Sequence, residues 1–86
     1  MTLLLLLGTA GCHLCEQAEE ILHTCMLKDS RLIVENIDIA EQASWQEKYA
    51  IQIPVVFHPE TQQDLLWPFD LEQLQVFIEQ ISVLEK

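Results

Sequence analysis

Two cysteines separated by two residues, Cys12 and Cys15, are the residues of this chain best suited to chemistry. They follow an apolar run and a turn of small residues, at the start of a pattern typical of a helix. On a first helical turn, this spacing brings two sulfurs within bonding reach, so the pair can cycle between dithiol and disulfide. Unpaired N–H groups and the positive end of the helix dipole stabilise a thiolate there. The spacing therefore predicts a redox site with Cys12 and Cys15 as its catalytic residues.

The histidine inside the pair allows two interpretations. A protonated His13 would stabilise the neighbouring thiolate and raise the reduction potential. Alternatively, its ring points into water. A zinc site could draw only on Cys12, Cys15, His23 and Cys25, and no second Cys-x-x-Cys pair is present, so we predict no metal. Cys25 lies on the apolar face of the same helical pattern and is predicted to be a buried small hydrophobe.

Four further residues, two histidines and two aromatic residues, are interpreted as surface or core residues. His23 and His58 are predicted to lie at the surface, with His58 in a turn over residues 58–61. Trp67 and Phe69 precede a helical pattern, where aromatic side chains usually contact the core, although they could instead line a groove near the dithiol.

Composition limits the class of protein. The chain has 86 residues, so we expect one domain over residues 1–86. Its net charge is −10, with 14 acidic residues against four lysines and arginines, which argues against nucleic acid and against anionic membranes as partners. Three cysteines do not form a disulfide framework. Because no disulfide framework and no membrane partner are expected, we expect a cytoplasmic protein. We also expect it to be a monomer.

The apolar run before Cys12 superficially resembles a bacterial lipoprotein signal. No lysine or arginine precedes the run, and its five leucines are fewer than the ~7–15 apolar residues of a signal segment. Cleavage there would also remove the best candidate for a first strand. We therefore interpret the run as that strand.

Apolar periodicity and turn residues predict the order β-α-β-α-β-β-α, an α/β fold. The predicted strands cover Leu3–Leu7, Leu32–Ile39, Ile53–Phe57 and Asp64–Trp67. The first predicted helix has its apolar face over Leu14–Cys25 and ends at Lys28. The second covers part of Glu41–Tyr49, and the third follows its cap residue Asp70, with Gln73 three residues on. The last two strands follow a tight turn and must be antiparallel.

Four segments, spread over nearly the whole chain, carry a family resemblance: Gly11-Cys12-His13-Leu14-Cys15, Glu35–Ile39, Lys48–Val56 and Trp67-Pro68-Phe69-Asp70. With them the chain resembles the glutaredoxin branch of the thioredoxin superfamily, in particular small bacterial glutaredoxin-like proteins formerly classed as a domain of unknown function. The resemblance implies a glutaredoxin-type thioredoxin-like fold, a four-stranded mixed sheet flanked by three helices.

The resemblance also implies roles for particular residues. Cys12 matches the nucleophile and Cys15 the resolving thiol. Ile53 and Pro54 would be joined by a cis peptide bond beside the dithiol, where they would bind an extended substrate segment, with His13 close by.

One departure from the family concerns glutathione. Glutathione-dependent relatives usually carry a Gly-Gly pair and an acidic residue before the last helix, whereas residues 65–70 contain no glycine, and no lysine or arginine is near Cys12. We therefore expect no bound cofactor and weak use of glutathione.

Two functions remain open. The first is a thiol–disulfide oxidoreductase acting on protein thiols and disulfides. The second is a non-catalytic binding module that holds a protein partner through the Ile53-Pro54 groove and an acidic surface, which could select basic or neutral partners.

Overall fold

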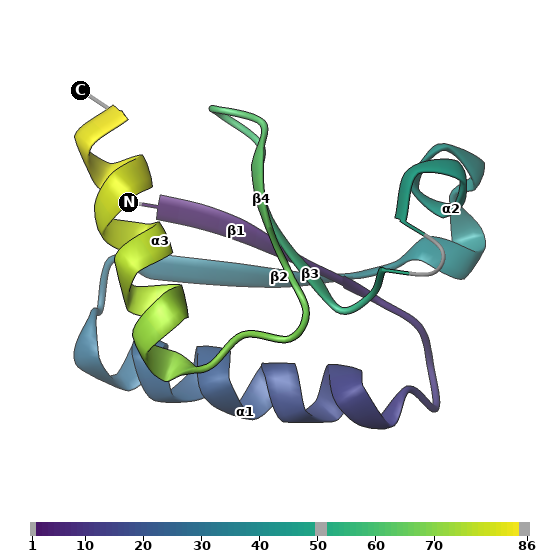
Figure 1. The fold of residues 1–86 in the computed structure, drawn as a ribbon, viewed down its shortest axis with the longest axis horizontal. Helices are drawn as coiled ribbons and strands as arrows, with labels where there is room; N and C mark the ends of the chain where they lie inside the picture. Colours follow the sequence, from purple (N-terminus) through teal and green to yellow (C-terminus); the bar gives the residue numbers. More distant parts are fainter. Residues whose placement is uncertain (1, 50–51, 85–86) are drawn as a thin grey trace.

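The structure is a computed structural model that describes residues 2–49 and 52–84. The elements follow the expected order, with one short 3-10 helix, η1, added after the second strand. They are β1 (Thr2–Gly8), α1 (His13–Lys28), β2 (Leu32–Asp38), η1 (Ile39–Glu41), α2 (Ala43–Tyr49), β3 (Val55–His58), β4 (Gln63–Leu66) and α3 (Leu71–Leu84) (Figure 1).

The four strands form one mixed sheet in the order β2-β1-β3-β4. β1 runs parallel to β2 along its full length, from the pair Thr2–Leu32 to the pair Gly8–Asp38. β3 is antiparallel to β1, and β4 is antiparallel to β3. The mixed α/β fold and the antiparallel last pair are therefore confirmed, and β1 is an interior strand, as its continuous apolar run predicts.

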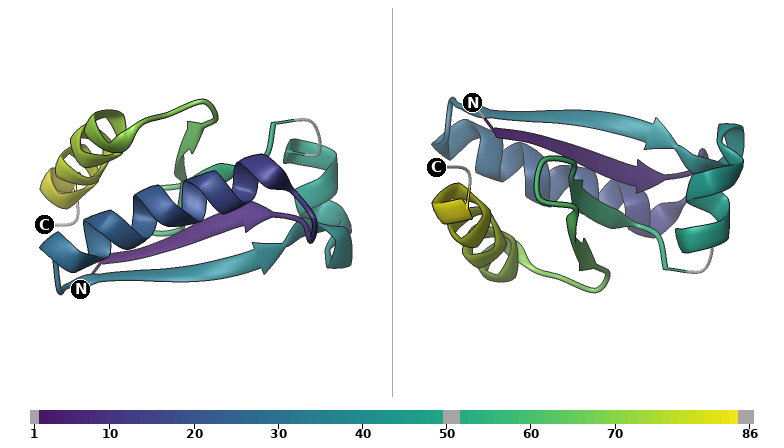
Figure 2. Two further views of the ribbon diagram at one scale, coloured as in Figure 1. Left: turned by 90° about the horizontal axis from the view of Figure 1, so that it is seen from below. Right: turned by 90° about the horizontal axis from the view of Figure 1, so that it is seen from above.

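One face of the sheet is covered by α1 and α3, which lie side by side in both views of Figure 2. Leu4, Leu6 and Val56 of the sheet pack there against apolar residues of the two helices, such as Leu22 and Leu74. The helical spacing of those residues places them on one side of each helix, so this cluster is the larger part of the core.

The opposite face carries a smaller, aromatic cluster next to α2. Tyr49 and Phe57 pack there with Leu7, Val55 and Ile39. The Tyr49 hydroxyl donates a hydrogen bond to Asp64 Oδ2 at 2.7 Å and so ties α2 to β4. Burial, together with this bond, raises the pKa of Tyr49 to about 12.

Side-chain caps set two element boundaries. Asp38 accepts a hydrogen bond from the Ala40 N–H at 2.9 Å, so β2 ends there, one residue before the predicted strand end, and η1 begins at Ile39. At the start of α3, Asp70 and Gln73 exchange two hydrogen bonds between side chain and backbone, at 2.8 and 3.0 Å. This is the predicted capping box.

The predicted surface position of His58 is wrong. β3 continues to His58, which pairs with Gln63 and is completely buried. Its Nδ1 lies 2.7 Å from the Thr61 hydroxyl oxygen, so the turn supplies a polar partner for the buried ring.

Within residues 2–49 and 52–84, no helix combines the length and the apolar character that a membrane crossing would require.

Candidate functional site

The dithiol lies at the start of α1, directly after the turn that connects β1 to this helix. Cys12 is the N-cap of α1, and its Sγ accepts a hydrogen bond from the Cys15 backbone N–H at 3.2 Å. Cys12 and Cys15 are joined by a disulfide, with Cα atoms 5.2 Å apart. An N–H donor and a helix N-terminus beside the Cys12 sulfur are the features that favour a thiolate when such a pair is reduced.

The two cysteines differ in exposure. Cys12 is partly exposed, whereas Cys15 is buried, with 7% of its surface accessible. A partner sulfur approaching from solvent therefore reaches Cys12 first, and Cys15 lies behind it on the first turn of the helix.

Two glycines shape the approach to the dithiol. A Cβ at Gly8 would lie 2.7 Å from Cys15 Sγ, so only glycine lets the end of β1 pass this close to the buried sulfur. Gly11 has φ +76°, a left-handed conformation that favours glycine, and it turns the chain into the N-cap. Both belong to the turn of small residues expected before the dithiol, but the contact between Gly8 and Cys15 was not expected. The sequence feature that could have indicated this contact is a glycine at the end of a buried strand, shortly before the dithiol.

His13 points away from the core of the site. Its side chain is 90% exposed, and its Nδ1 lies 3.7 Å from a carboxylate oxygen of Glu16, one turn further along α1. Of the two interpretations from sequence, this position agrees with the solvent-facing one.

Ile53 and Pro54 lie at the same end of the sheet. The Ile53–Pro54 peptide bond is cis, as is Trp67–Pro68, which the sequence analysis did not consider. Pro54 is buried, and its carbonyl accepts a hydrogen bond from the Trp67 N–H at 3.2 Å. Because Val55 pairs with Leu7, the proline follows on beside the end of β1 from which the chain leads to the dithiol. Direct contact between Pro54 and the dithiol stays a prediction.

The other candidate ligands do not join this site. Cys25 is 3% exposed and packed in the core three turns along α1, and burial raises the pKa of its thiol. His23 is exposed, as expected. In the described part of the chain, no three histidines, cysteines or acidic residues are grouped so that they could hold a metal ion.

Positive charge is sparse around the dithiol. Lys28 and Arg31 lie at the opposite end of α1, in the last turn of the helix and just before β2. Lys48, on α2, holds its ammonium 5.3 Å from the centre of the Tyr49 ring and 5.9 Å from that of Phe57. No ion pair between the dithiol region and these three cations is present among the described residues.

Comparison with known proteins gives this arrangement a family. The model of the glutaredoxin-like domain (DUF836) matches residues 3–79, which include the dithiol and the Ile53–Pro54 bond. This chain belongs to the glutaredoxin-like family. No curated protein sequence matches it significantly.

Two solved structures of glutaredoxin-like size extend the comparison. Protein XcR50 from X. campestris, solved by X-ray methods, shares 29% identity over 88% of this chain and 95% of its own, with a TM-score of 0.72. Protein Ne2328 from Nitrosomonas europaea, solved by NMR, shares 25% identity over 88% of this chain and 89% of its own, with a TM-score of 0.76. The glutaredoxin-like fold of this chain is thus shared along nearly its full length.

Proposed function

We propose that this glutaredoxin-like protein is a thiol–disulfide oxidoreductase that reduces or exchanges disulfides of partner proteins. The observation that carries the proposal is the unequal pair at the start of α1. Cys12 is the partly exposed N-cap, and Cys15 is buried one turn behind it. Such a pair has one thiol for attack and one for resolution.

The proposed cycle has two exchange steps. The Cys12 thiolate attacks one sulfur of a partner disulfide, that S–S bond breaks, and the partner's second sulfur leaves as a thiolate that takes up a proton. The Cys15 thiolate then attacks Cys12 Sγ and displaces the partner's first sulfur, which is protonated in turn. Two electrons and two protons pass to the partner, and the protein is left with the Cys12–Cys15 disulfide. A dithiol donor restores the reduced pair.

Ile53, Pro54 and His13 are proposed to bind the substrate. Support comes from the position of Pro54 at the end of β1 and from the exposure of the His13 ring beside Cys12. We propose the cytoplasm as the compartment, because a dithiol reductant needs reducing surroundings. A monomeric state is proposed because copies of net charge −10 repel one another.

The decisive experiment is a trap. In the Cys15→Ser variant, the mixed disulfide on Cys12 cannot be resolved, so partner proteins should remain covalently attached and be released by reductant. The Cys12→Ser variant should trap none. The Cys25→Ala variant is the matched control, because it removes a third thiol from the same helix and should leave trapping by Cys15→Ser unchanged.

The same experiment separates the two candidate functions. A non-catalytic binding module would hold the same partners without covalent bonds, and the double variant lacking both Cys12 and Cys15 would retain them. Absence of covalent adducts in Cys15→Ser, with binding retained in the double variant, would replace the oxidoreductase by the binding module.

Weak use of glutathione is part of the proposal. Glutathione carries carboxylates that need cationic partners, whereas no lysine or arginine is near Cys12 in the sequence, and Lys48 on α2 holds its ammonium 5.3 Å from the centre of the Tyr49 ring. Reduction of the Cys12–Cys15 disulfide by glutathione should therefore be much slower than its reduction by a protein dithiol donor, most clearly at low salt, where repulsion by the net charge of −10 is strongest. Equal rates with both reductants would contradict this part of the proposal.

A further inference from the structure

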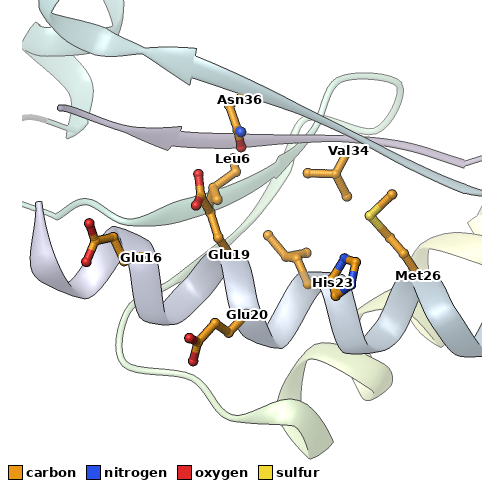
Figure 3. Close-up of a pocket in the computed structure, with 9 residues that line it drawn as sticks. Leu6, Glu16, Glu19, Glu20, His23, Met26, Val34 and Asn36 are labelled. Atoms are coloured by element: carbon orange, nitrogen blue, oxygen red, sulfur yellow. The ribbon is translucent and has the colours of Figure 1, made fainter.

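A long groove runs between α1 and the sheet, on the side of β2 (Figure 3). Its volume is about 610 Å³. One wall consists of side chains from α1, and the floor comes from β1 and β2; the main contributors are Glu16, Glu19 and Glu20 on the wall and Leu6, Val34 and Asn36 on the floor. Glu19 and Asn36 point toward one another across the groove.

The groove continues toward the dithiol. A smaller pocket of about 250 Å³ is lined by Gly8, Cys15 and Asp38, and it shares Glu19 and Asn36 with the larger groove. The two hollows therefore form one path along α1, which ends beside the buried sulfur of the redox pair.

The path is lined by acidic side chains without a lysine or arginine among them. Three glutamates line the groove, and Asp38 lines its end. Lys28, Arg31 and Lys48, the lysines and arginine of the described residues, line neither hollow, and His23 is the one histidine among the lining residues. A ligand with positive charges would thus meet carboxylates that have no lysine or arginine neighbour in the path.

The strand that floors the groove is an edge strand. β2 pairs with β1 on one side and has no strand on the other within the described sheet. Figure 2 shows α1 lying along β1, with no helix over the outer flank of β2. An extended segment added to β2 would lie about 4.7–4.9 Å beyond it, beside the groove, with alternate side chains directed to the helix-covered face.

We propose that this groove docks an extended, basic segment of a partner protein. The segment pairs with the outer edge of β2 and directs lysine or arginine side chains toward Glu16, Glu19 and Glu20. The methylene stems of such side chains fit a floor that contains Leu6 and Val34. The inference rests on the proposed function and names its partner class: proteins whose disulfide lies near a basic extended segment.

Charge also decides against a second copy of this chain as the occupant. The outer face of β2 carries Glu35, and the protein as a whole has a net charge of −10. Pairing two β2 edges would bring like charges together, whereas a basic segment would neutralise them.

The test uses the Cys12→Ser, Cys15→Ser double variant, so that binding is measured without sulfur exchange. The probes are two fluorescent peptides, one alternating lysine with threonine and one alternating glutamate with threonine. We expect the lysine peptide alone to bind, with weaker binding at higher salt and slower hydrogen exchange in β2. Equal binding of the two peptides, or protection confined to other strands, would overturn the proposal.

A matched charge control separates the groove from the overall field. The triple change Glu16→Gln, Glu19→Gln, Glu20→Gln should weaken binding of the lysine peptide about tenfold, the sum of three surface ion pairs. The control changes three exposed glutamates outside the groove to glutamine, namely Glu47, Glu72 and Glu79. This control variant has the same net charge as the groove variant. An equal loss of peptide binding in both would show that the groove does not bind the peptide specifically.

Strand pairing is tested through the peptide backbone. Two versions of the lysine peptide carry N-methyl groups on alternate residues, offset by one position. The version that blocks the N–H groups facing β2 should lose binding, and the other should retain it. Equal binding of both would rule out strand addition. Because the Cys12→Ser, Cys15→Ser double variant used here has no reactive pair, failure here leaves the covalent trap unaffected, and failure of the trap leaves this result standing.

Discussion

The two ends of α1 carry the same functional group in opposite settings. At the N-terminus, Cys12 caps the helix in partial contact with solvent, and backbone N–H groups face its sulfur. Near the C-terminus, Cys25 is 3% exposed within the core, and desolvation raises the pKa of its thiol, with Lys28 opposing and Asp29 adding to the effect. Position along one helix thus separates a thiol fit for exchange from one that serves as packing.

The contrast explains why the number of cysteines says little about function. The helix dipole favours an anion at the first turn and disfavours one at the last. Burial of Cys25 acts in the same direction as the dipole, because both penalise the thiolate. At Cys12 the dipole favours the anion instead, and the residue is less buried than Cys25.

Alkylation of the reduced protein should reveal this contrast most strongly. We expect Cys12 to react first, with a rate–pH midpoint below that of an ordinary thiol, because the helix N-terminus stabilises its anion. Cys25 should react at least ~100-fold more slowly and reach full rate only on unfolding, because it is buried and has a raised pKa. Peptide mass spectrometry at timed intervals measures both. First modification at Cys15, or equal rates at Cys12 and Cys25, would show that the assignment of roles is wrong.

Substitution of Gly8 by alanine tests how β1 keeps Cys15 buried behind Cys12. The added Cβ would lie 2.7 Å from Cys15 Sγ, so β1 and α1 must separate, at a cost of about 1–3 kcal/mol in the free energy of unfolding. Urea unfolding of the oxidised protein measures the loss, and the alkylation rate of Cys15 in the reduced protein should rise.

The matched control for this prediction is Gly11→Ala. Gly11 has a positive φ, but an added Cβ there meets no atom within 4 Å. It should lose stability through backbone strain of about 1–2 kcal/mol and leave the exposure of Cys15 unchanged. Similar alkylation rates of Cys15 in the Gly8→Ala and Gly11→Ala variants would show that Gly8 has no particular role in shielding Cys15.

Much of the molecule was predictable because local signals and tertiary packing agree. The leucine run, the apolar face of α1 and the box formed by Asp70 and Gln73 each use a pattern whose physical cause lies within a few residues. The position of the dithiol followed from the Cys-x-x-Cys spacing at the start of a helical pattern, and the four-stranded mixed sheet with three helices followed from the family resemblance. The order β2-β1-β3-β4 within the sheet was not predicted. That resemblance could be stated because its motifs, including Ile53-Pro54, span nearly the whole chain.

The features missed from sequence depend on contacts between distant segments. His58 belongs to a turn-like sequence, yet its pairing with Gln63 and its contact with Thr61 draw it into the sheet. The close approach of Gly8 to Cys15 and the groove beneath Glu19 arise from the way α1 lies on β1. No spacing within one segment encodes that packing, so only the folded arrangement shows these features.

The smallest expected effect is the pH dependence of stability that Cys25 contributes. Its pKa is raised in the folded state, so below the ordinary thiol value the group is neutral both folded and unfolded, and its contribution is fully present. As the pH rises through about 8.5, the unfolded chain loses the thiol proton first, and the free energy of unfolding falls. Titration of an unfolded thiol limits this fall to about 1.4 kcal/mol at pH ~9.5.

Urea unfolding of the oxidised protein between pH ~7 and ~9.5 measures this slope, in a range below the titration of Tyr49, whose pKa is about 12. In the oxidised protein Cys12 and Cys15 do not titrate, so Cys25 is the only thiol that can respond. Cys25→Ala and Cys25→Val should both flatten the slope, whatever their effect on stability at pH 7. If the slope persists in both variants, another group causes it, and the two ends of α1 differ in exposure but not in the ionisation of their thiols.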